Sequence, residues 1–410
     1  MFAQNLRNSQ GFSLLLLPLI VAALLLLVVG GYFFLNQQSQ TPTTSDHQGI
    51  KQSSQTFVIG AVLPLSGDDA DYGIPIKQSA QIAQKEINNQ GGIKGQKVEI
   101  FFEDGKCDDK AATKAVEKLL TEHPSNINLV IGGACSTEFL AIAKITQPKK
   151  IITITSSATS PNISKLGKYV FRTAPSDAFS GFGAAEYATN KLKFKTAAII
   201  VQNKEYPLAL REVFSSRFRE LGGKIVSDEI FETGTTDFSA IALKVKNANP
   251  DVVYIVPQST TPGVLTIDAL KKSGVKATLL GAEGLFIREE IQQNATIMEG
   301  FIGLEPVFDE SRSQAKSFID KYKKEYSQAV KFPNYMGGMY DLIYLIKQAA
   351  ESGGQTSDQM SEYLYHLQGY EGVIGTIKFD SNGDIRLPYS IKKITSGELV
   401  EIDKYIPTSQ

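Results

Sequence analysis

The chain has 410 residues, which is more than one ordinary hydrophobic core accommodates and enough for two domains. Apolar residues make up 42% of it and charged residues 21%, a composition typical of a folded protein and not of a disordered one. Its formal net charge is -1, with 42 basic residues dispersed among 43 acidic ones, so the sequence predicts no basic surface for nucleic acid.

The N-terminal region contains an uncharged apolar run at residues 12–35, FSLLLLPLIVAALLLLVVGGYFFL. At about 1.5 Å per residue, about 24 helical residues cross a hydrocarbon core of about 30 Å, so the run predicts a transmembrane anchor. Arg7 is the only charged residue before the run, which favours a cytoplasmic location for residues 1–11. The alternative is a signal peptide cleaved after Gly30 or Gly31, although the apolar part of a signal peptide is normally only about 7 to 15 residues long.

Residues 36–55 are almost wholly polar and show no apolar period, which predicts a flexible linker. With the N-terminus inside, the body of the protein is expected on the extracytoplasmic side of the cell membrane, as in a single-pass protein.

From residue 56 onward, short β-rich runs alternate with helical runs, which is typical of βαβ units and parallel sheets. The first unit is a strand at 56–62 followed by a helix at 73–90, whose apolar residues recur at spacings of three and four. The pattern continues with strands at 97–103, 128–131 and 151–155 and helices at 108–122 and 137–146. The sequence therefore predicts a first α/β lobe with a parallel sheet covered by helices.

A second series of alternating elements begins near residue 177. It comprises helices at 177–192, 208–221, 237–247 and 262–273 and strands at 196–201, 224–230, 251–256 and 277–280. Three further helices are predicted at 311–327, 337–351 and 357–367, before a hairpin at 375–387. The expected fold class is therefore α/β.

No motif in the sequence predicts a metal site, a cofactor or a catalytic nucleophile. The three histidines are far apart and have no metal-ligand spacing. Residues 380–384 resemble the start of a calcium loop, but Ile391 stands at the twelfth position where a bidentate Glu is required, so we interpret them as a hairpin turn. The sequence therefore predicts a protein without metal or cofactor that is not an enzyme.

Residues 58–99, VIGAVLPLSGDDADYGIPIKQSAQIAQKEINNQGGIKGQKVE, resemble the opening of the periplasmic leucine/isoleucine/valine-binding protein family, the type I binding proteins of ABC importers. The similarity continues, in the same order as in that family, through FFEDGKCDD (101–109), LVIGGACST (129–137), ITSSATSP (154–161), VFRTAPSD (170–177), TGTTDFSA (233–240), PDVVYI (250–255) and LLGAEGL (279–285).

The resemblance implies a two-lobed type I fold in which each lobe is a parallel sheet with helices on both faces. Three crossovers are expected to join the lobes, near residues 174–177, 299–303 and 379–386. The lobes would then be discontinuous in the chain, with lobe one at 56–176 and 304–379 and lobe two at 177–303 and 387–410.

Three hydroxyl residues of lobe one match the positions at which the family holds the α-carboxylate and α-amino groups of its ligand. They are Ser136, Ser157 and Thr159, and each follows the end of a predicted strand. Loops that open helices present N–H groups and hydroxyls to an anion. The alternative is that these residues only cap helices.

Lobe two is expected to contribute an acidic residue and an aromatic side chain, which the resemblance assigns to Glu283 and Tyr206. Asp177, at the first crossover, would help to bind the ammonium group. Alternatively, Glu283 pairs with Arg288 or caps the helix that comes after it. The side-chain pocket of the family corresponds here to Tyr72, Ala134 and Cys135.

The sequence departs from the family at residues 256–259, Val-Pro-Gln-Ser, where an aromatic residue is common. The class of ligand side chain therefore stays open. If Gln258 faces the cleft, it would favour a ligand with an amide or a hydroxyl group.

The only two cysteines, Cys107 and Cys135, are expected to form a disulfide, because the family pairs cysteines at these positions and the chain is expected to be exported. Free buried thiols are the alternative.

The function implied by the resemblance is capture of a small molecule, an amino acid of the branched-chain or a related class, between two closing lobes. The expected partner is an ABC permease in the same membrane. The alternative is an extracellular ligand-sensing module that acts through a separate signalling partner.

Overall fold

The computed structural model describes residues 56–123, 127 and 129–407. The predicted cytoplasmic segment, anchor and linker, residues 1–11, 12–35 and 36–55, lie outside these residues. No helix in the described part of the chain is long and apolar enough to cross a membrane.

The first lobe is built on a five-stranded sheet in which all neighbouring strands are parallel, in the order β2-β1-β3-β4-β5. Its strands are β1 (Phe57–Leu63), β2 (Val98–Asp104), β3 (Leu129–Gly132), β4 (Ile152–Thr155) and β5 (Val170–Arg172). Its helices are α2 (Ala70–Asn89), α3 (Asp109–Glu122), α4 (Ser136–Thr146), α11 (Ser313–Tyr326), α12 (Pro333–Ser352) and α13 (Ser357–Tyr365).

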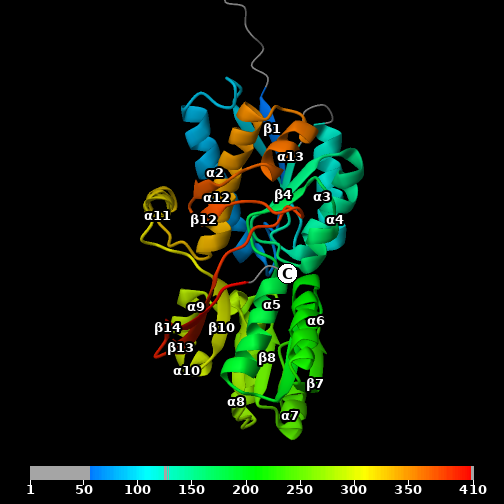
Figure 1. Ribbon diagram of the computed structural model, residues 1–410, viewed down its shortest axis with the longest axis vertical. Helices are drawn as coiled ribbons and strands as arrows, with labels where there is room; N and C mark the ends of the chain where they lie inside the picture. The colour runs from blue at the N-terminus through cyan, green and yellow to red at the C-terminus, as the bar shows by residue number, and fades with distance from the viewer. Residues whose placement is uncertain (1–55, 124–126, 128, 408–410) are drawn as a thin grey trace, which may run out of the picture. The chain divides into compact units, whose positions relative to one another are not determined.

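Alternation of side chains along β1 explains why helices cover both faces of this sheet. Ile59, Ala61 and Leu63 are buried in one core together with residues of α2, α11, α12 and α13. Val58 and Val62 point to the opposite face, where they pack with α3 and α4. In Figure 1, α3 and α4 accordingly lie at one side of the sheet and α2 and α12 at the other.

The second lobe has a seven-stranded sheet in the order β14-β13-β10-β9-β8-β6-β7. Its strands are β6 (Thr196–Gln202), β7 (Lys224–Phe231), β8 (Val252–Val256), β9 (Thr278–Ala282), β10 (Ile302–Pro306), β13 (Tyr389–Thr395) and β14 (Glu398–Tyr405). Only the β10–β13 and β13–β14 pairs are antiparallel.

The helices of the second lobe also cover both faces of its sheet. One face is covered by α5 (Asp177–Glu186) and α6 (Glu205–Glu220), and the other by α7 (Ser239–Ala248), α8 (Thr260–Lys272), α9 (Arg288–Gln293) and α10 (Ala295–Met298). Alternate residues of β6 pack with the two sets: Ala197, Ile199 and Val201 with α5 and α6, and Ala198 and Ile200 with the other four helices. A π-helical turn, Tyr187–Lys191, extends α5.

The chain passes between the two lobes three times, after β5, after β10 and after β12. This topology confirms the predicted two-lobed fold class. The second crossing comes after Pro306, because β10 stays in the seven-stranded sheet through that residue, whereas the sequence placed the crossing at 299–303. The other lobe boundaries stay predictions.

The predicted hairpin at 375–387 is wrong. The strand at its start, β12 (Gly375–Ile377), pairs with the preceding β11 (Tyr370–Gly372), so the hairpin comes earlier in the chain. Residues 380–384 do form the expected turn, in which the Gly383 N–H donates to the carbonyl of Asp380. The next strand after this turn is β13, which joins the sheet of the other lobe.

Candidate functional site

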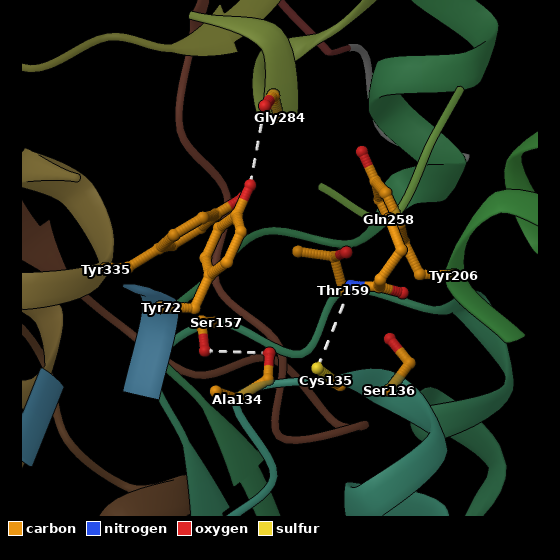
Figure 2. A pocket seen from close by; sticks show the side chains of 10 residues that line it. All are labelled: Tyr72, Ala134, Cys135, Ser136, Ser157, Thr159, Tyr206, Gln258, Gly284 and Tyr335. Atoms are coloured by element: carbon orange, nitrogen blue, oxygen red, sulfur yellow. Dashed lines mark hydrogen bonds between the residues drawn. The ribbon is translucent and has the colours of Figure 1, made fainter. Parts of the chain in front are cut away.

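The candidate site lies at the carboxyl ends of parallel strands from both sheets, the usual place for ligands in open α/β folds. One cavity at this place is lined by residues that come after β1, β3 and β4 in the first lobe and β6, β8 and β9 in the second, together with a residue from α12. The lining residues are Tyr72, Ala134, Cys135, Ser136, Ser157, Thr159, Tyr206, Gln258, Gly284 and Tyr335, all shown in Figure 2.

A tight turn between β3 and α4 positions Cys135 and Ser136. Gly133 adopts a φ of +63°, and a Cβ there would lie 2.4 Å from the Phe139 backbone nitrogen, so the turn requires glycine. Cys135 is the N-cap of α4, and its backbone N–H donates to Glu138 at the third helical position. Ser136 therefore begins the helix at the cavity wall.

The loop after β4 is fixed by hydrogen bonds from its own residues. The Thr155 hydroxyl accepts from the backbone N–H groups of Ser157 and Ala158, at 3.2 and 3.1 Å. The Ser157 hydroxyl donates to the carbonyl of Ala134 at 3.0 Å, a bond drawn in Figure 2. The Ser136 hydroxyl accepts from the backbone of Ser160 at 3.1 Å. These bonds hold the hydroxyl groups of two loops side by side.

Tyrosines from both lobes surround the cavity. Tyr72, on α2, stacks on Phe332 with ring centroids 4.3 Å apart, and its hydroxyl donates to the Gly284 carbonyl of the other lobe at 3.4 Å. Tyr206 lies in the first turn of α6, and burial raises its pKa, as does the nearby Glu283. Figure 2 shows Tyr72 and Tyr335 at one side of the cavity and Tyr206 at the other.

Two residues with buried carboxyl groups, Glu283 and Asp177, hydrogen-bond to residues that line the cavity. Glu283 opens the short 3-10 turn Glu283–Leu285 after β9, and its Oε1 accepts a 2.6 Å hydrogen bond from the Tyr335 hydroxyl. Its Oε2 atom is buried and has no hydrogen-bond partner among the described residues. Burial raises the pKa of Glu283, although the Tyr335 bond opposes this shift. The alternative pairing with Arg288 is not present, since Arg288 contacts Glu310 at 3.3 Å.

Asp177 is the first residue of α5 and only 1% exposed. Its backbone N–H donates to the carbonyl of Thr159 at 2.9 Å, and its Oδ2 atom is a second buried carboxylate oxygen without a partner in the described part of the chain. Burial raises the pKa of Asp177 well above its usual range, and the charge of Glu283 acts in the same direction.

The structure thus brings six of the predicted ligand-binding residues to the lining of one cavity, and the other two hydrogen-bond to lining residues. The six are Tyr72, Cys135, Ser136, Ser157, Thr159 and Tyr206, and the two are Asp177 and Glu283. Their role in binding stays a prediction. Tyr335 was missed, because the helix that carries it begins at Pro333 and not at the predicted residue 337.

Cys107 and Cys135 form the expected disulfide, with Cα atoms 5.4 Å apart. In the described residues, the one group of side chains close enough to bind a metal consists of Asp69 and these two cysteines. Their sulfur atoms are bonded to each other, so they offer no thiolate ligand.

Comparison with known proteins identifies the family. Residues 56–397 match the family described as periplasmic binding protein. A Leu/Ile/Val-binding protein homologue of Brucella melitensis is 28% identical over 351 residues, which are 85% of this chain and 94% of the relative.

Two solved structures have the same fold. One is the branched-chain amino acid transporter substrate-binding protein of Streptococcus pneumoniae in complex with isoleucine, with a TM-score of 0.75, 26% identity, and coverage of 86% of this chain and 100% of that one. A solute-binding protein of an ABC transporter from R. palustris, in complex with benzoate, has a TM-score of 0.76 and coverage of 86% and 97%, but at 18% identity the likeness is of fold alone.

Proposed function

The chain belongs to the periplasmic binding protein family, and from this premise we propose that it captures an amino acid between its lobes and delivers it to the permease of an ABC importer. Members of the family are binding proteins, so the chain is an extracytoplasmic solute-binding protein and not an enzyme. The relatives that are named for leucine, isoleucine and valine, or that bind isoleucine, support an amino acid as the ligand.

The observation that carries the proposal is the pair of unpartnered carboxylate oxygens, Asp177 Oδ2 and Glu283 Oε2. Each of these two buried oxygens is unfavourable as it stands, because it has lost its hydration and gained no hydrogen bond in exchange. An ammonium group is a cation with three N–H donors, so it can satisfy both oxygens. A ligand with an amino group is therefore favoured over a simple acid.

The hydroxyl residues of the cavity fit the other end of an amino acid. Ser136, Ser157 and Thr159 present hydroxyl groups there, and Ser136 is the first residue of α4, where helix N–H groups favour an anion. Buried carboxyl groups and hydroxyl groups at one cavity are the groups that a zwitterion needs for its two charges.

Ligand entry requires the lobes to separate. The cavity has a volume of about 30 Å³, enough for one or two water-sized groups but not for an amino acid. It is closed by contacts between the lobes, such as the bond from Tyr72 to Gly284. Hinge motion at the three crossings would break these contacts, and closure would restore them around the ligand.

Calorimetric titration of the full-length chain in detergent tests the proposal, with a panel of amino acids and with benzoate, which has a carboxylate but no ammonium. At least one amino acid should bind with micromolar or tighter affinity, and benzoate should not compete. Glu283→Gln, which keeps the size of the side chain but removes its charge, should weaken binding by at least about 2 kcal/mol, or about thirtyfold.

The matched control for this variant is Glu310→Gln, since the Glu310 side chain is 59% exposed and pairs with Arg288 away from the cavity. It should bind like the wild type. Equal affinity of wild type and Glu283→Gln, or binding only of ligands without an amino group, would contradict the proposal.

We further propose that residues 12–35 stay attached and anchor the protein in the cell membrane, with its body outside. N-terminal sequencing of protein from the membrane fraction should find an N-terminus at or before Phe12. A soluble form that begins near Gly31 would instead establish a cleaved signal peptide.

A further inference from the structure

Gln258 enters the candidate site from the second lobe, on the loop between β8 and α8. It is 8% exposed and lines the same cavity as the hydroxyl residues of the first lobe. Its side chain reaches across the cleft, where Nε2 lies 3.8 Å from the sulfur of Cys135, an approach drawn in Figure 2. The amide group therefore belongs to the wall that a ligand would contact.

A second glutamine fixes Gln258 in place. The backbone N–H of Gln258 donates to Gln202 Oε1 at 2.9 Å, and Gln202 Nε2 donates in turn to the Thr233 hydroxyl at 3.0 Å. Gln202 is the last residue of β6 and is itself only 4% exposed. The backbone of Gln258 is thus held by buried hydrogen bonds within the second lobe, and these do not depend on contact with the first.

The chemistry of Cys135 decides which end of the amide is available. A disulfide sulfur has no proton and can only accept a hydrogen bond, so the NH₂ group of Gln258 faces the sulfur. The carbonyl oxygen is then left as an acceptor. It is buried and has no partner among the described residues.

We propose that Gln258 is a specificity-determining residue that selects amino acids whose side chains carry an O–H or N–H donor. The inference rests on the proposed function, since it concerns the side-chain end of the same ligand. A donor on the ligand satisfies the buried carbonyl of Gln258, whereas an aliphatic side chain covers it and leaves it unpaired. The preferred ligands are therefore hydroxyl or amide amino acids and not the purely aliphatic ones.

Two pairs of amino acids of nearly equal shape test this proposal on the full-length chain by calorimetry. Threonine differs from valine by a hydroxyl in place of a methyl group, and asparagine is close in size to leucine but carries an amide. The donor-bearing member should bind about tenfold or more tightly in at least one pair. A smaller ratio in both pairs, or tighter binding of valine and leucine, would overturn the proposal.

The variant Gln258→Met keeps the length of the side chain and removes its acceptor. The affinity ratio of the sensitive pair should fall to near one, and because the two ligands are measured on the same variant, a general loss of affinity cancels. Gln258→Leu serves as a second variant, and thermal melting checks that both are folded. A ratio that persists in both variants would show that another residue sets the preference.

Failure of the proposed function gives a different result. If the wild type binds no amino acid at all, both proposals fall together. If it binds amino acids through Glu283 but prefers the aliphatic ones, only the role of Gln258 is wrong.

Discussion

Arg172 and Asp384 form a buried ion pair, although they are 212 positions apart in the chain. Arg172 Nε and Nη2 donate to the two carboxylate oxygens at 2.6 and 3.0 Å, and the side chains are 0% and 7% exposed. Arg172 ends β5, just before the first crossing between the lobes, and Asp384 lies on the third crossing. The pair therefore ties two hinge segments together.

Removal of one partner should be strongly destabilising. In Asp384→Asn the Arg172 guanidinium stays buried without its counter-ion, so the free energy of unfolding should fall by about 3 to 5 kcal/mol in chemical denaturation. The control is Glu325→Gln, which breaks a contact with Lys85 at the surface, where the Glu325 side chain is 43% exposed and that of Lys85 60%. That change should lower the free energy of unfolding by less than about 1 kcal/mol. Equal stability of Asp384→Asn and wild type would rule out this role.

The disulfide should contribute to stability through the loop that it closes. Cys107 and Cys135 are 28 residues apart, which corresponds to about 3.6 kcal/mol in the loop-entropy treatment. The double variant Cys107→Ser/Cys135→Ser should unfold at a correspondingly lower denaturant concentration. A reductant should destabilise the wild type but not the variant. Thiol titration of denatured, unreduced protein should find no free thiol, and two free thiols would refute the prediction.

An ion pair between the lobes should favour the closed form. Lys204, next to the start of α6, contacts Asp69 of the first lobe at 2.9 Å, and the side chains are 17% and 9% exposed. Lys204→Met should weaken ligand binding by roughly fivefold, or about 1 kcal/mol, because the pair exists only when the lobes are in contact. The melting temperature should hardly change.

Lys85→Met is the control for Lys204→Met, since Lys85 pairs with Glu325 within the first lobe. It should leave the affinity unchanged. If both variants bind as tightly as the wild type, Lys204 does not contribute to closure.

Glu138 should make stability depend on pH. Its carboxyl group is fully buried beside the disulfide, and burial raises its pKa to about 8, although the N–H groups of Cys107 and Cys135 oppose the shift. In the unfolded chain, Glu138 loses its proton near pH 4.5, whereas the folded protein keeps it to about pH 8. Because the folded state binds the extra proton in this interval, Glu138 destabilises the protein progressively as the pH rises from 4.5 to 8.

Denaturation curves at several pH values check this effect. The Glu138→Gln variant cannot titrate, so its stability should fall less steeply between about pH 5 and 8 than that of the wild type, by up to about 1.4 kcal/mol per pH unit. Parallel pH profiles for the two proteins would show that Glu138 is already ionised in the fold.

Local structure accounts for where the hydroxyl residues stand in the chain, whereas their assignment to a binding site came from the family resemblance and stays a prediction. Ser136 and Ser157 come after strand ends, and strand ends can be located from the alternation of β-rich and helical runs. Tyr335 could not be found in this way. Its bond to Glu283 joins residues 52 positions apart, and only the packing of α12 against the second lobe brings them together.

The error at residues 375–387 has a similar origin. β12 and the turn at 380–384 have the local features of a hairpin, but strand pairing is decided by which partners are close in space. Here β11 is the neighbour of β12, and the turn is fixed by Arg172, whose backbone N–H donates to the Gly383 carbonyl at 2.9 Å. β12 thus pairs with the strand before it, and the turn after it contacts β5 instead of closing a hairpin.

The order of strands in the second sheet has a consequence for how the chain folds while it is being synthesised. β13 pairs with β10, yet all of α11, α12 and α13 are synthesised between them. Until β13 has emerged, through residue 395, β10 lies at an open sheet edge, and such edges promote aggregation of nascent chains. The second lobe has to wait for β13 and β14, which follow all elements of the first lobe, so we expect that a chain in transit across the membrane depends on chaperones until these last strands arrive.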